Sequence, residues 1–371
     1  MASIRLVSAA QWSEFDGLLD VRSPAEFAED HIPGAINVPV LDDAERARVG
    51  TLYVQVSPFE ARKVGAALIA RNIATHIEQH FLHKPKTWRP LVYCWRGGQR
   101  SGAMAHILSQ IGWATGQLQG GYKAYRQLVR AELQTLPARF SFRVVCGPTG
   151  SGKSRLLQAL AACGAQVLDL EQLANHRGSL LGNLPGAAQP SQKGFETQLW
   201  GVLRGFNPER PVFVEAESRK IGVLSLPDGL LDAIRLGDCL LLKTDTEARA
   251  SLLLEDYEHF PREPELLFEK LDQLTPLHGR QTLEHWRQLA ENGKWRQLVI
   301  ELLETHYDPA YKKSTHSHFS RYGQASIVQL PRLDRASLLD TAQTVCSNSA
   351  IMNPGNQAVK LKENSGNVRS G

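Results

Sequence analysis

The sequence has few cysteines, no long apolar run and little net charge, and each of these shortages excludes a class of protein. Its five cysteines stand far apart, at positions 94, 146, 163, 239 and 346. An odd and scattered set forms neither a disulfide framework nor a paired metal-binding motif, so we expect a reducing compartment. No stretch approaches the roughly 18 apolar residues of a membrane span, and the N-terminus lacks the apolar core of a secretion signal. We therefore expect a cytoplasmic protein without membrane segments.

The net charge of +4 permits an anionic partner but does not require one. The 371 residues are 42% hydrophobic and 22% charged, which is ordinary for a folded protein of two domains, or three. Residues 136–139 (LPAR) are typical of a linker, so the expected domains are 1–136 and 137–345. The second domain should end in a helical part, because residues 281–306 carry apolar side chains at helical spacing. The C-terminal end of the chain is polar and rich in Gly, Asn and Ser, which predicts a disordered tail over 346–371.

An apolar run ending in Cys94 leads through a glycine pair into a helical pattern, which predicts a strand, a tight loop and a helix. The loop amides, the positive end of the helix dipole and two nearby guanidiniums, Arg96 and Arg100, would all favour the thiolate. Gly97 and Gly98 let the backbone amides point inward and form a nest for an anionic group. Cys94 is therefore a candidate nucleophile. The alternative is a buried, inert cysteine at the end of a strand.

Short apolar strands alternate with helices in this part of the chain, so we expect a parallel α/β sheet with ligands at the carboxyl ends of its strands. The segment DVRSPAEFAEDHIPGAINVP, followed by YCWRGGQRS, resembles a rhodanese domain over about residues 10–135. This resemblance implies that the loop cysteine carries sulfur or selenium as a persulfide or perselenide. Cys94 and Arg100 also have the C-x5-R spacing of phosphatases. Phosphatases usually have histidine before the cysteine, where this chain has Tyr93, so we favour the chalcogen carrier.

A second motif follows the strand predicted over residues 142–146 and precedes a predicted helix. It matches G-x-x-x-x-G-K-[ST] in full, with Gly147, Pro148, Thr149, Gly150, Ser151, Gly152, Lys153 and Ser154. Its glycines let the backbone wrap a phosphate, Lys153 supplies a charge to a diphosphate, and the Ser154 hydroxyl could bind Mg²⁺. The strand and helix on either side disfavour a chance glycine-rich turn. The motif indicates a diphosphate, without specifying a nucleotide or its hydrolysis.

Four carboxylates at predicted strand ends are candidate acidic partners of this loop: Asp169, Glu171, Glu215 and Glu217. A nucleoside triphosphatase normally has an acidic residue at such a position to organise Mg²⁺. Surface glutamates at a strand end would give the same pattern, and this alternative stays open. No adenine-recognition element is evident.

Two further features of the second domain concern loops and RNA. Residues 174–179, 192–196 and 215–222 concentrate charge beside glycine, which indicates either ordered loops at a site or solvated loops. Residues 311–322 interleave basic and aromatic side chains, a composition suited to phosphate neutralisation and base stacking on RNA. The candidate RNA contacts are Lys312, Lys313 and Arg321. A plain amphipathic surface is the alternative.

The two motifs together are more specific than either alone. YCWRGGQRS, followed by VVCGPTGSGKS, LDLEQLANHRGS and VEAESRKIG, closely resembles the tRNA 2-selenouridine synthase family over about residues 10–330. The resemblance implies a rhodanese-like parallel-sheet domain followed by a P-loop NTPase-like α/β domain. It also implies an enzyme that converts 2-thiouridine at the wobble position of tRNA, in Lys, Glu and Gln tRNAs, into 2-selenouridine. Selenophosphate would be the selenium donor, and an S-geranyl intermediate would form from geranyl diphosphate.

This chemistry suits both motifs. Alkylation turns the sulfur on C2 into a better leaving group, and selenium delivered with Cys94 as the carrier could then displace geranylthiol. The P-loop would hold the diphosphate of the prenyl donor without any need for ATP. We expect a monomer with no tightly bound cofactor, and with Mg²⁺ at Ser154 if a metal is used. Two alternatives remain: a sulfurtransferase or C-x5-R phosphatase fused to an ATP-dependent P-loop kinase, and a non-catalytic RNA-binding module.

Overall fold

The computed structural model describes residues 4–179, 181–183 and 186–351, without the side chains of 314–317 and 349–351. The chain forms two compact units, each described here by itself. The N-terminal unit comprises residues 1–134 together with 190–201, and the C-terminal unit comprises 135–189 together with 202–371. The boundary after residue 134 lies beside the expected linker, which forms a short 3-10 turn, η3 (Leu136–Arg139). In the described part of the chain, none of the helices has the length and apolarity required to cross a membrane.

The N-terminal unit is built on a five-stranded sheet with the strand order β1-β5-β4-β2-β3. Every neighbouring pair is parallel, as the rhodanese resemblance predicts. The strands are β1 (Arg5–Val7), β2 (Gly17–Asp20), β3 (Ala35–Asn37), β4 (Pro90–Tyr93) and β5 (Gly116–Leu118). The helices are α1 (Pro24–Glu29), α2 (Asp43–Gln55), α3 (Pro58–His76), α4 (Gln99–Ile111) and α5 (Gly121–Thr135), joined by part of α8 (Gln192–Arg204).

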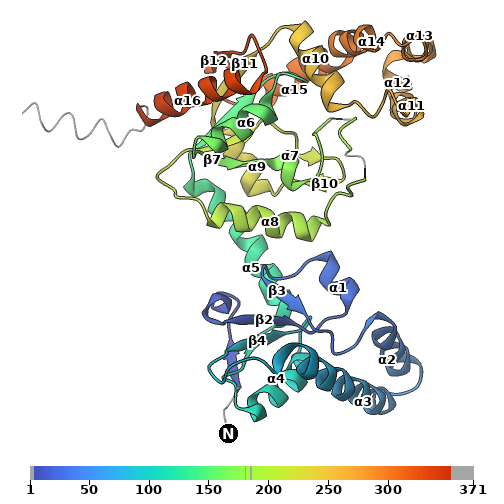
Figure 1. The fold of residues 1–371 in the computed structure, drawn as a ribbon, viewed down its shortest axis with the longest axis vertical. Helices are drawn as coiled ribbons and strands as arrows, with labels where there is room; N and C mark the ends of the chain where they lie inside the picture. The colour runs from blue at the N-terminus through green and yellow to red at the C-terminus, as the bar shows by residue number, and fades with distance from the viewer. Residues whose placement is uncertain (1–3, 180, 184–185, 352–371) are drawn as a thin grey trace, which may run out of the picture. The chain divides into compact units, whose positions relative to one another are not determined.

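Local capping signals start these helices where the sequence places them. Ser23 and Glu26 form a capping box at the start of α1, and Pro24 occupies the first helical position. Helix α3 is followed directly by the π-helical turn η2 (Ile77–Phe81). Helices α3 and α4 lie beside the strands β2 and β4 (Figure 1). They bury side chains in one core with these strands, and all four residues of β4 are buried.

The C-terminal unit contains a second parallel sheet, with the strand order β12-β11-β6-β8-β7. Its strands are β6 (Phe142–Cys146), β7 (Gln166–Leu168), β8 (Val212–Glu215), β11 (Asp238–Lys243) and β12 (Ser326–Gln329), with a small hairpin of β9 (Lys220–Ile221) and β10 (Leu224–Ser225). Because β6 lies at the centre, the loop after it opens at the carboxyl ends of β8 and β11. The helices around this sheet are α6 (Lys153–Ala162), α7 (Leu170–Leu173), α9 (Asp228–Arg235), α10 (Thr246–Asp256), α15 (Asp308–His318) and α16 (Arg335–Ile351).

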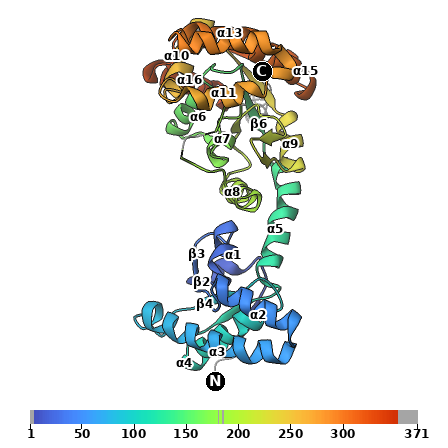
Figure 2. The same ribbon diagram turned by 90° about the vertical axis from the view of Figure 1, so that its right-hand side faces the viewer.

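A helical part with its own core adjoins α10, as predicted for this region. It consists of α11 (Pro264–Asp272), α12 (Thr275–His278), α13 (Arg280–Glu291), α14 (Trp295–Leu302) and the π-helical turn η4 (Leu303–Tyr307). Figure 2 shows α11 and α13 among these orange helices. The apolar stripes of α13 and α14 face the core, and Leu283, Trp286 and Leu298 are buried, which confirms the prediction from helical spacing.

Two expectations about segments without regular secondary structure are wrong. The disordered tail was expected from residue 346, but α16 continues to Ile351 because Val345 and Cys346 still pack against the apolar core. The rest of the expected tail, 352–371, lies outside the described residues. Residues 192–196 are not a loop: they form the first turn of α8.

Candidate functional site

Cys94 follows β4 directly, and residues 95–98 form the tight loop that the sequence predicts before α4. Gly97 and Gly98 adopt left-handed φ angles of +72° and +76°, a conformation that side chains other than glycine rarely adopt. Gly98 is also the N-cap of α4, so the loop ends at the positive end of that helix. The sheet, the loop and the helix are therefore arranged around Cys94 as predicted.

The structure buries the cysteine itself. Its side chain is 1% exposed and packs in the core shared by β4 and α4, although the sequence places it at the mouth of the loop. Polar contacts remain, since the thiol donates to the Arg96 carbonyl at 3.5 Å and the Ser101 hydroxyl donates to Sγ at 3.4 Å. The sulfur is thus in contact with hydrogen-bonding groups but closed to solvent in this conformation.

The two arginines of the loop differ in their surroundings. Arg96 is exposed, whereas Arg100 forms an ion pair with Glu26 at 3.0 Å. Burial alone would raise the pKa of the Glu26 carboxyl, but the hydrogen bond and the charge of Arg100 outweigh it and hold that pKa below its usual value. Because a carboxylate already binds the Arg100 guanidinium, this arginine is less suited to gripping a phosphate, and the geometry disfavours the C-x5-R phosphatase.

Backbone groups at the start of α5 hold the loop from the other side. The Tyr122 and Lys123 amides donate to the carbonyls of Cys94 and Trp95 at 2.8 and 3.0 Å. Gly121, with φ +60°, lies so close that a Cβ atom there would collide with the Cys94 carbonyl oxygen. This role of Gly121 was not predicted from the sequence. The available signal was a glycine pair directly before a helix.

A buried polar network surrounds the base of the loop. Arg22 is fully buried, and its guanidinium donates to Asp20 at 2.6 Å and to the Asp30 carbonyl at 2.7 Å. The same guanidinium stacks 3.7 Å above the ring of Tyr122, whose hydroxyl donates to Asp30 at 2.6 Å. Burial, followed by the hydrogen bond to Asp30, raises the pKa of Tyr122 above its usual value. The loop therefore lies beside a buried layer that hydrogen bonds connect, although Arg22 Nη1 has no partner among the described residues.

Helix α8 supplies further partners to this network. The Thr197 hydroxyl donates to Asp30 at 3.0 Å, and Arg126 donates to Thr197 at 3.0 Å and also pairs with Glu196. Lys193 lies 5.6 Å from the centre of the Trp95 ring, within cation–π range of the residue next to Cys94. These contacts explain why residues 190–201 belong to the N-terminal unit.

The glycine-rich loop after β6 has the conformation expected of a phosphate cradle. Gly150 and Gly152 have φ angles of +77° and +86°, and the Lys153 ammonium donates to the Gly147 carbonyl at 2.9 Å. The Gly147 amide donates to the Tyr311 hydroxyl at 2.6 Å. The Ser151 hydroxyl is buried, with no partner among the described residues. Binding of an anion by the amides of this loop stays a prediction.

The four predicted carboxylates converge next to this loop. The Ser154 hydroxyl donates to Glu171 at 2.7 Å, and the Glu171 amide donates to Glu215 at 2.8 Å. Glu215 is 1% exposed at the end of β8, so the surface-glutamate alternative is wrong for it. Asp169 caps α7 beside Glu171, and Glu217 lines the cavity in front of the loop.

Burial and mutual repulsion raise the pKa values of these carboxyls and so disfavour their ionised form. Burial, followed by the charges of Asp169, Glu171 and Glu217, raises the pKa of Glu215 well above its usual value. Burial, followed by the charge of Glu171, raises the pKa of Glu217 to about 8, against the opposing effect of Lys153. The pKa values of Asp169 and Glu171 are raised as well, chiefly by burial. A cation bound here would relieve this repulsion.

The donors fit a magnesium ion. Hydroxyl and carboxylate oxygens are its preferred protein ligands, and it usually takes only one or two carboxylates together with waters and substrate phosphates. Ser154 and Glu171 supply such oxygens beside the loop, and Glu215 Oε2 is a buried oxygen without a partner in the described part of the chain. Within the described residues, no group of three metal-binding side chains is already arranged around one point.

The loop and the carboxylates line a cavity of about 2590 Å³, part of it open to solvent. Residues 177–179 and 216–220 also line it, so two of the three charged segments singled out in the sequence lie at a site. Further cations on its walls are Arg155, Arg177, Arg219, Lys220 and Arg235.

The segment expected to contact RNA is divided between this cavity and the surface. Tyr311, His318 and Phe319 line the cavity, which our sequence analysis did not foresee. Lys312 and Lys313 are exposed, and Arg321 pairs with Asp238 at 2.6 Å. A role for these three basic residues in binding RNA stays a prediction.

Comparisons with known proteins give a match to the region around the Cys94 loop and another to the region around the P-loop. A family model described as a rhodanese-like domain matches residues 5–128, and one described as the tRNA 2-selenouridine synthase AAA domain matches residues 140–266. Three similar proteins, each called tRNA 2-selenouridine synthase, come from Nitrosomonas europaea, Shewanella denitrificans and Hydrogenovibrio crunogenus. They are 37%, 39% and 37% identical over 65% of this chain.

The matches cover 63% and 65% of the Nitrosomonas and Shewanella proteins, just under two thirds of their lengths, and 67% of the Hydrogenovibrio protein. Both units match a family model, and each model matches the unit that contains the corresponding loop. With this agreement, and with 37% identity across 67% of a relative, the chain belongs to the tRNA 2-selenouridine synthase family.

Proposed function

We propose that the protein is a tRNA-modifying transferase that converts 2-thiouridine at the wobble position into 2-selenouridine. Family membership supports the reaction class, and the site geometry supports a division of the chemistry between two loops. The observation that carries the proposal is the conformation of the loop at 147–154. The left-handed glycines at 150 and 152 and the ammonium of Lys153 suit a diphosphate, and they stand beside hydroxyl and carboxylate oxygens suited to Mg²⁺.

In the first half-reaction, the sulfur on C2 of the base attacks the first carbon of geranyl diphosphate. A carbon–sulfur bond forms, a carbon–oxygen bond breaks, the diphosphate leaves with the electron pair, and the proton on N3 of the base passes to solvent. The loop amides and Lys153 stabilise the charge that develops on the departing diphosphate. If Mg²⁺ is bound, Ser154 and Glu171 would hold it and it would add positive charge there. No hydrolysis of ATP enters this reaction.

In the second half-reaction, selenium from selenophosphate bonds to C2 and geranylthiol leaves, while water takes the phosphoryl group of the donor as phosphate. We assign Cys94 to this step as the nucleophile that attacks C2 and expels geranylthiol, after which selenium from the donor bonds to C2 and the carbon–sulfur bond to Cys94 breaks, so that no oxidant is needed; Ser101 hydrogen-bonds its sulfur. Because Sγ is closed to solvent, the 95–98 segment has to open for this step. Gly97 and Gly98 permit that movement, since glycine adopts more backbone conformations than other residues.

Mass analysis of the wobble uridine tests the proposal, after incubation of thiolated tRNA with geranyl diphosphate and selenophosphate. Lys153→Ala should lower geranylation by about 100-fold or more, because it removes a charge that stabilises the leaving diphosphate. Cys94→Ser should still geranylate the base but should not convert it to 2-selenouridine. Full geranylation by Lys153→Ala, or normal selenation by Cys94→Ser, would contradict these assignments.

Three further assays distinguish the alternatives. A P-loop kinase would turn over ATP without tRNA, and a C-x5-R phosphatase would release phosphate from a simple phosphomonoester. A non-catalytic RNA-binding module would bind tRNA equally well with Cys94 and Lys153 replaced. Charge reversal at Lys312 and Lys313 tests the proposed RNA surface, because lost phosphate contacts should weaken tRNA binding and reduce its dependence on salt.

A further inference from the structure

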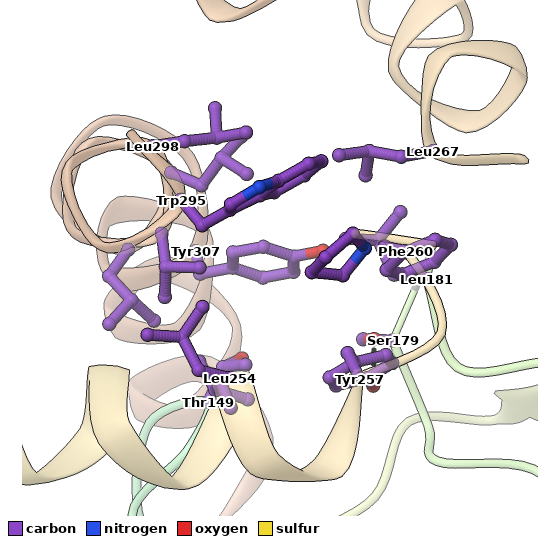
Figure 3. A pocket seen from close by; sticks show the side chains of 15 residues that line it. Thr149, Ser179, Leu181, Leu254, Tyr257, Phe260, Leu267, Trp295, Leu298 and Tyr307 are labelled. Atoms are coloured by element: carbon purple, nitrogen blue, oxygen red, sulfur yellow. Dashed lines mark hydrogen bonds between the residues drawn. The ribbon is translucent and has the colours of Figure 1, made fainter. Parts of the chain in front are cut away.

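The apolar pocket beside the P-loop is small. Its lining includes Thr149 of the P-loop, Leu254 of α10, Leu267 of α11, and Trp295 and Leu298 of α14 (Figure 3). The pocket has a free volume of about 60 Å³. An apolar cavity that holds benzene has about 150 Å³, so this pocket is a gap left by helix packing and is too small for an organic ligand.

A polar side chain in the other unit, Gln117, lies close to the Cys94 loop. Gln117 is the middle residue of β5 and is half-buried, between the buried residues Gly116 and Leu118. Strand β5 pairs directly with β4, the strand that ends before Cys94. A Cβ atom at Gly98 would stand 2.8 Å from Gln117 Nε2, so the side chain lies against the glycine pair of the loop. A polar group in such a position is expected to have hydrogen-bonding partners.

The Gln117 amide group uses both of its hydrogen atoms on the loop and the start of α4. Its Nε2 donates to the Gly98 carbonyl at 2.8 Å and to the Ser101 hydroxyl oxygen at 2.9 Å. A carbonyl oxygen can only accept hydrogen bonds, so the amide must face it with its nitrogen. The Gly98 carbonyl therefore determines the orientation of the Gln117 amide.

The Ser101 hydroxyl has two acceptors within reach, the Gly98 carbonyl at 3.3 Å and Cys94 Sγ at 3.4 Å. A carbonyl oxygen has two lone pairs, and at Gly98 both are used. The Gly102 amide donates to one at 2.6 Å, and Gln117 donates to the other. Because this carbonyl is occupied, the hydroxyl hydrogen of Ser101 is left for the sulfur.

We propose that Gln117 is a positioning residue that directs the hydroxyl hydrogen of Ser101 onto Cys94 Sγ. This inference rests on the proposed function and adds a residue to its second half-reaction. Sγ is negatively charged before it attacks C2 and again when it leaves C2, and a hydrogen bond from Ser101 stabilises that charge. The bond from Gln117 to Ser101 Oγ polarises the hydroxyl and strengthens its donation. Gln117 thus acts on the sulfur through Ser101.

The pH dependence of Cys94 alkylation tests this inference on the full-length protein without tRNA. Iodoacetamide reacts with the thiolate, and mass analysis of the peptide that contains Cys94 separates it from the other cysteines. Gln117→Met keeps the length of the side chain but donates no hydrogen bond, so the Ser101 hydroxyl can turn to the Gly98 carbonyl. The pH of half-maximal alkylation should rise by about one unit. An unchanged midpoint would overturn the inference.

Gln117→Glu provides a second variant that keeps the size and polarity of the side chain. Its carboxylate accepts a hydrogen bond from Ser101 where the amide donated one, so the alkylation midpoint should rise in this variant as well. Gln119→Met is the matched control, because Gln119 is exposed and follows Gln117 by two positions. It should leave the midpoint unchanged, and a rise as large as that in Gln117→Met would contradict the assignment.

A mutant cycle with Ser101→Ala separates positioning from a merely structural role. Ser101→Ala removes the hydrogen bond to Sγ and should raise the alkylation midpoint by itself. Since Gln117 acts through Ser101, adding Gln117→Met to Ser101→Ala should move the midpoint no further. A further rise in the double variant would show that Gln117 influences the sulfur in another way, and the inference would fail.

Selenation of geranylated tRNA connects this inference to the proposed function. Gln117→Met should slow selenation by about tenfold and leave geranylation unchanged. Slow selenation with an unchanged alkylation midpoint would leave the proposed function intact and remove this role of Gln117. Normal selenation by Cys94→Ser would contradict the proposed function, while a shifted midpoint in Gln117→Met would still place the Ser101 hydrogen on Sγ.

Discussion

At the scale of single residues, the two candidate loops differ in whether the charged side chains beside them have partners of opposite charge. Around Cys94, each buried charge has a partner, as Arg22 has in Asp20 and Arg100 has in Glu26. Beside the P-loop, carboxyls of one sign crowd together and their pKa values rise. The paired charges around Cys94 stabilise one conformation of its loop. The crowded carboxyls beside the P-loop would be stabilised by a bound cation.

The raised pKa of Glu217 predicts how stability depends on pH. The folded protein holds the Glu217 proton up to about pH 8, whereas the unfolded chain releases it near the usual value of 4.5. Between these pH values the folded state binds more protons, so the free energy of unfolding should fall as pH rises and then level off above pH 8. Glu217→Gln should flatten this decline by about 1 kcal/mol or more in urea unfolding measured from pH 5 to 9. Glu284→Gln, at an exposed position of α13, is the control and should leave the curve unchanged.

The buried pair of Arg22 and Asp20 gives a second prediction at this scale. Arg22→Met should lower the free energy of unfolding by about 3–5 kcal/mol, because it leaves a buried carboxylate without its partner. The double variant with Asp20→Asn should recover part of that loss, since the unpaired charge is then removed. Urea unfolding of both variants measures the effect. A loss below about 1 kcal/mol in the single variant would mean that the pair is dispensable.

At the scale of elements, each candidate loop lies between a strand and a helix and is held by another helix against its backbone. The start of α5 holds the Cys94 loop, and α10 holds the P-loop through Gly150 and Arg249. In both cases close backbone approach requires glycine. A substitution there should move the loop without touching the reacting side chain.

Gly121→Ala should therefore impair selenation while sparing geranylation. Its Cβ would collide with the Cys94 carbonyl oxygen, so the loop must shift. Gly112→Ala is the matched control: its φ is +111°, also in the left-handed region, but no atom lies within 4 Å of the added Cβ. The rate of Cys94 alkylation by iodoacetamide, measured in both variants, should change only in Gly121→Ala. Equal rates would show that contact with α5 does not control the loop.

At the scale of the whole molecule, the chain crosses between its two units more than once. Residues 190–201 follow the P-loop in sequence but belong to the N-terminal unit, where Thr197 and Glu196 complete the partners of Asp30 and Arg126. A boundary drawn at a single linker therefore does not separate the units. The N-terminal unit needs a helix that the second half of the chain supplies.

A fragment of residues 1–134 should consequently be less stable than the same unit in the intact chain. Asp30 and Arg126 would lose their buried partners, and the melting temperature should fall by about 5 °C or more. Hydrogen exchange of the β2 and β4 amides would compare the fragment with the full chain. Addition of a peptide covering residues 190–204 should restore protection, and equal protection without it would contradict the role of α8.

Much of the site could be predicted because its signals are local. The glycines at 97–98 and 150–152 determine two loop conformations, and the apolar spacing of α13 and α14 determines which side chains face the core. Contacts between distant parts of the chain could not be predicted. Tyr311 meets Gly147 across 164 positions, and Arg100 meets Glu26 across 74. The local composition around Tyr311 and Arg100 predicted RNA and phosphate binding but gave no sign of these two contacts, which arise from packing.

The sequence by itself determined the order of the two domains, their parallel sheets and the positions of both loops. These features depend on short-range periodicity, on glycine conformations and on strand–loop–helix motifs. The tertiary structure alone decided that Cys94 is closed to solvent, that α8 completes the first unit, and that an apolar pocket lies beside the P-loop. Burial and cavities arise from how separate elements pack against one another, and local sequence patterns do not determine that packing.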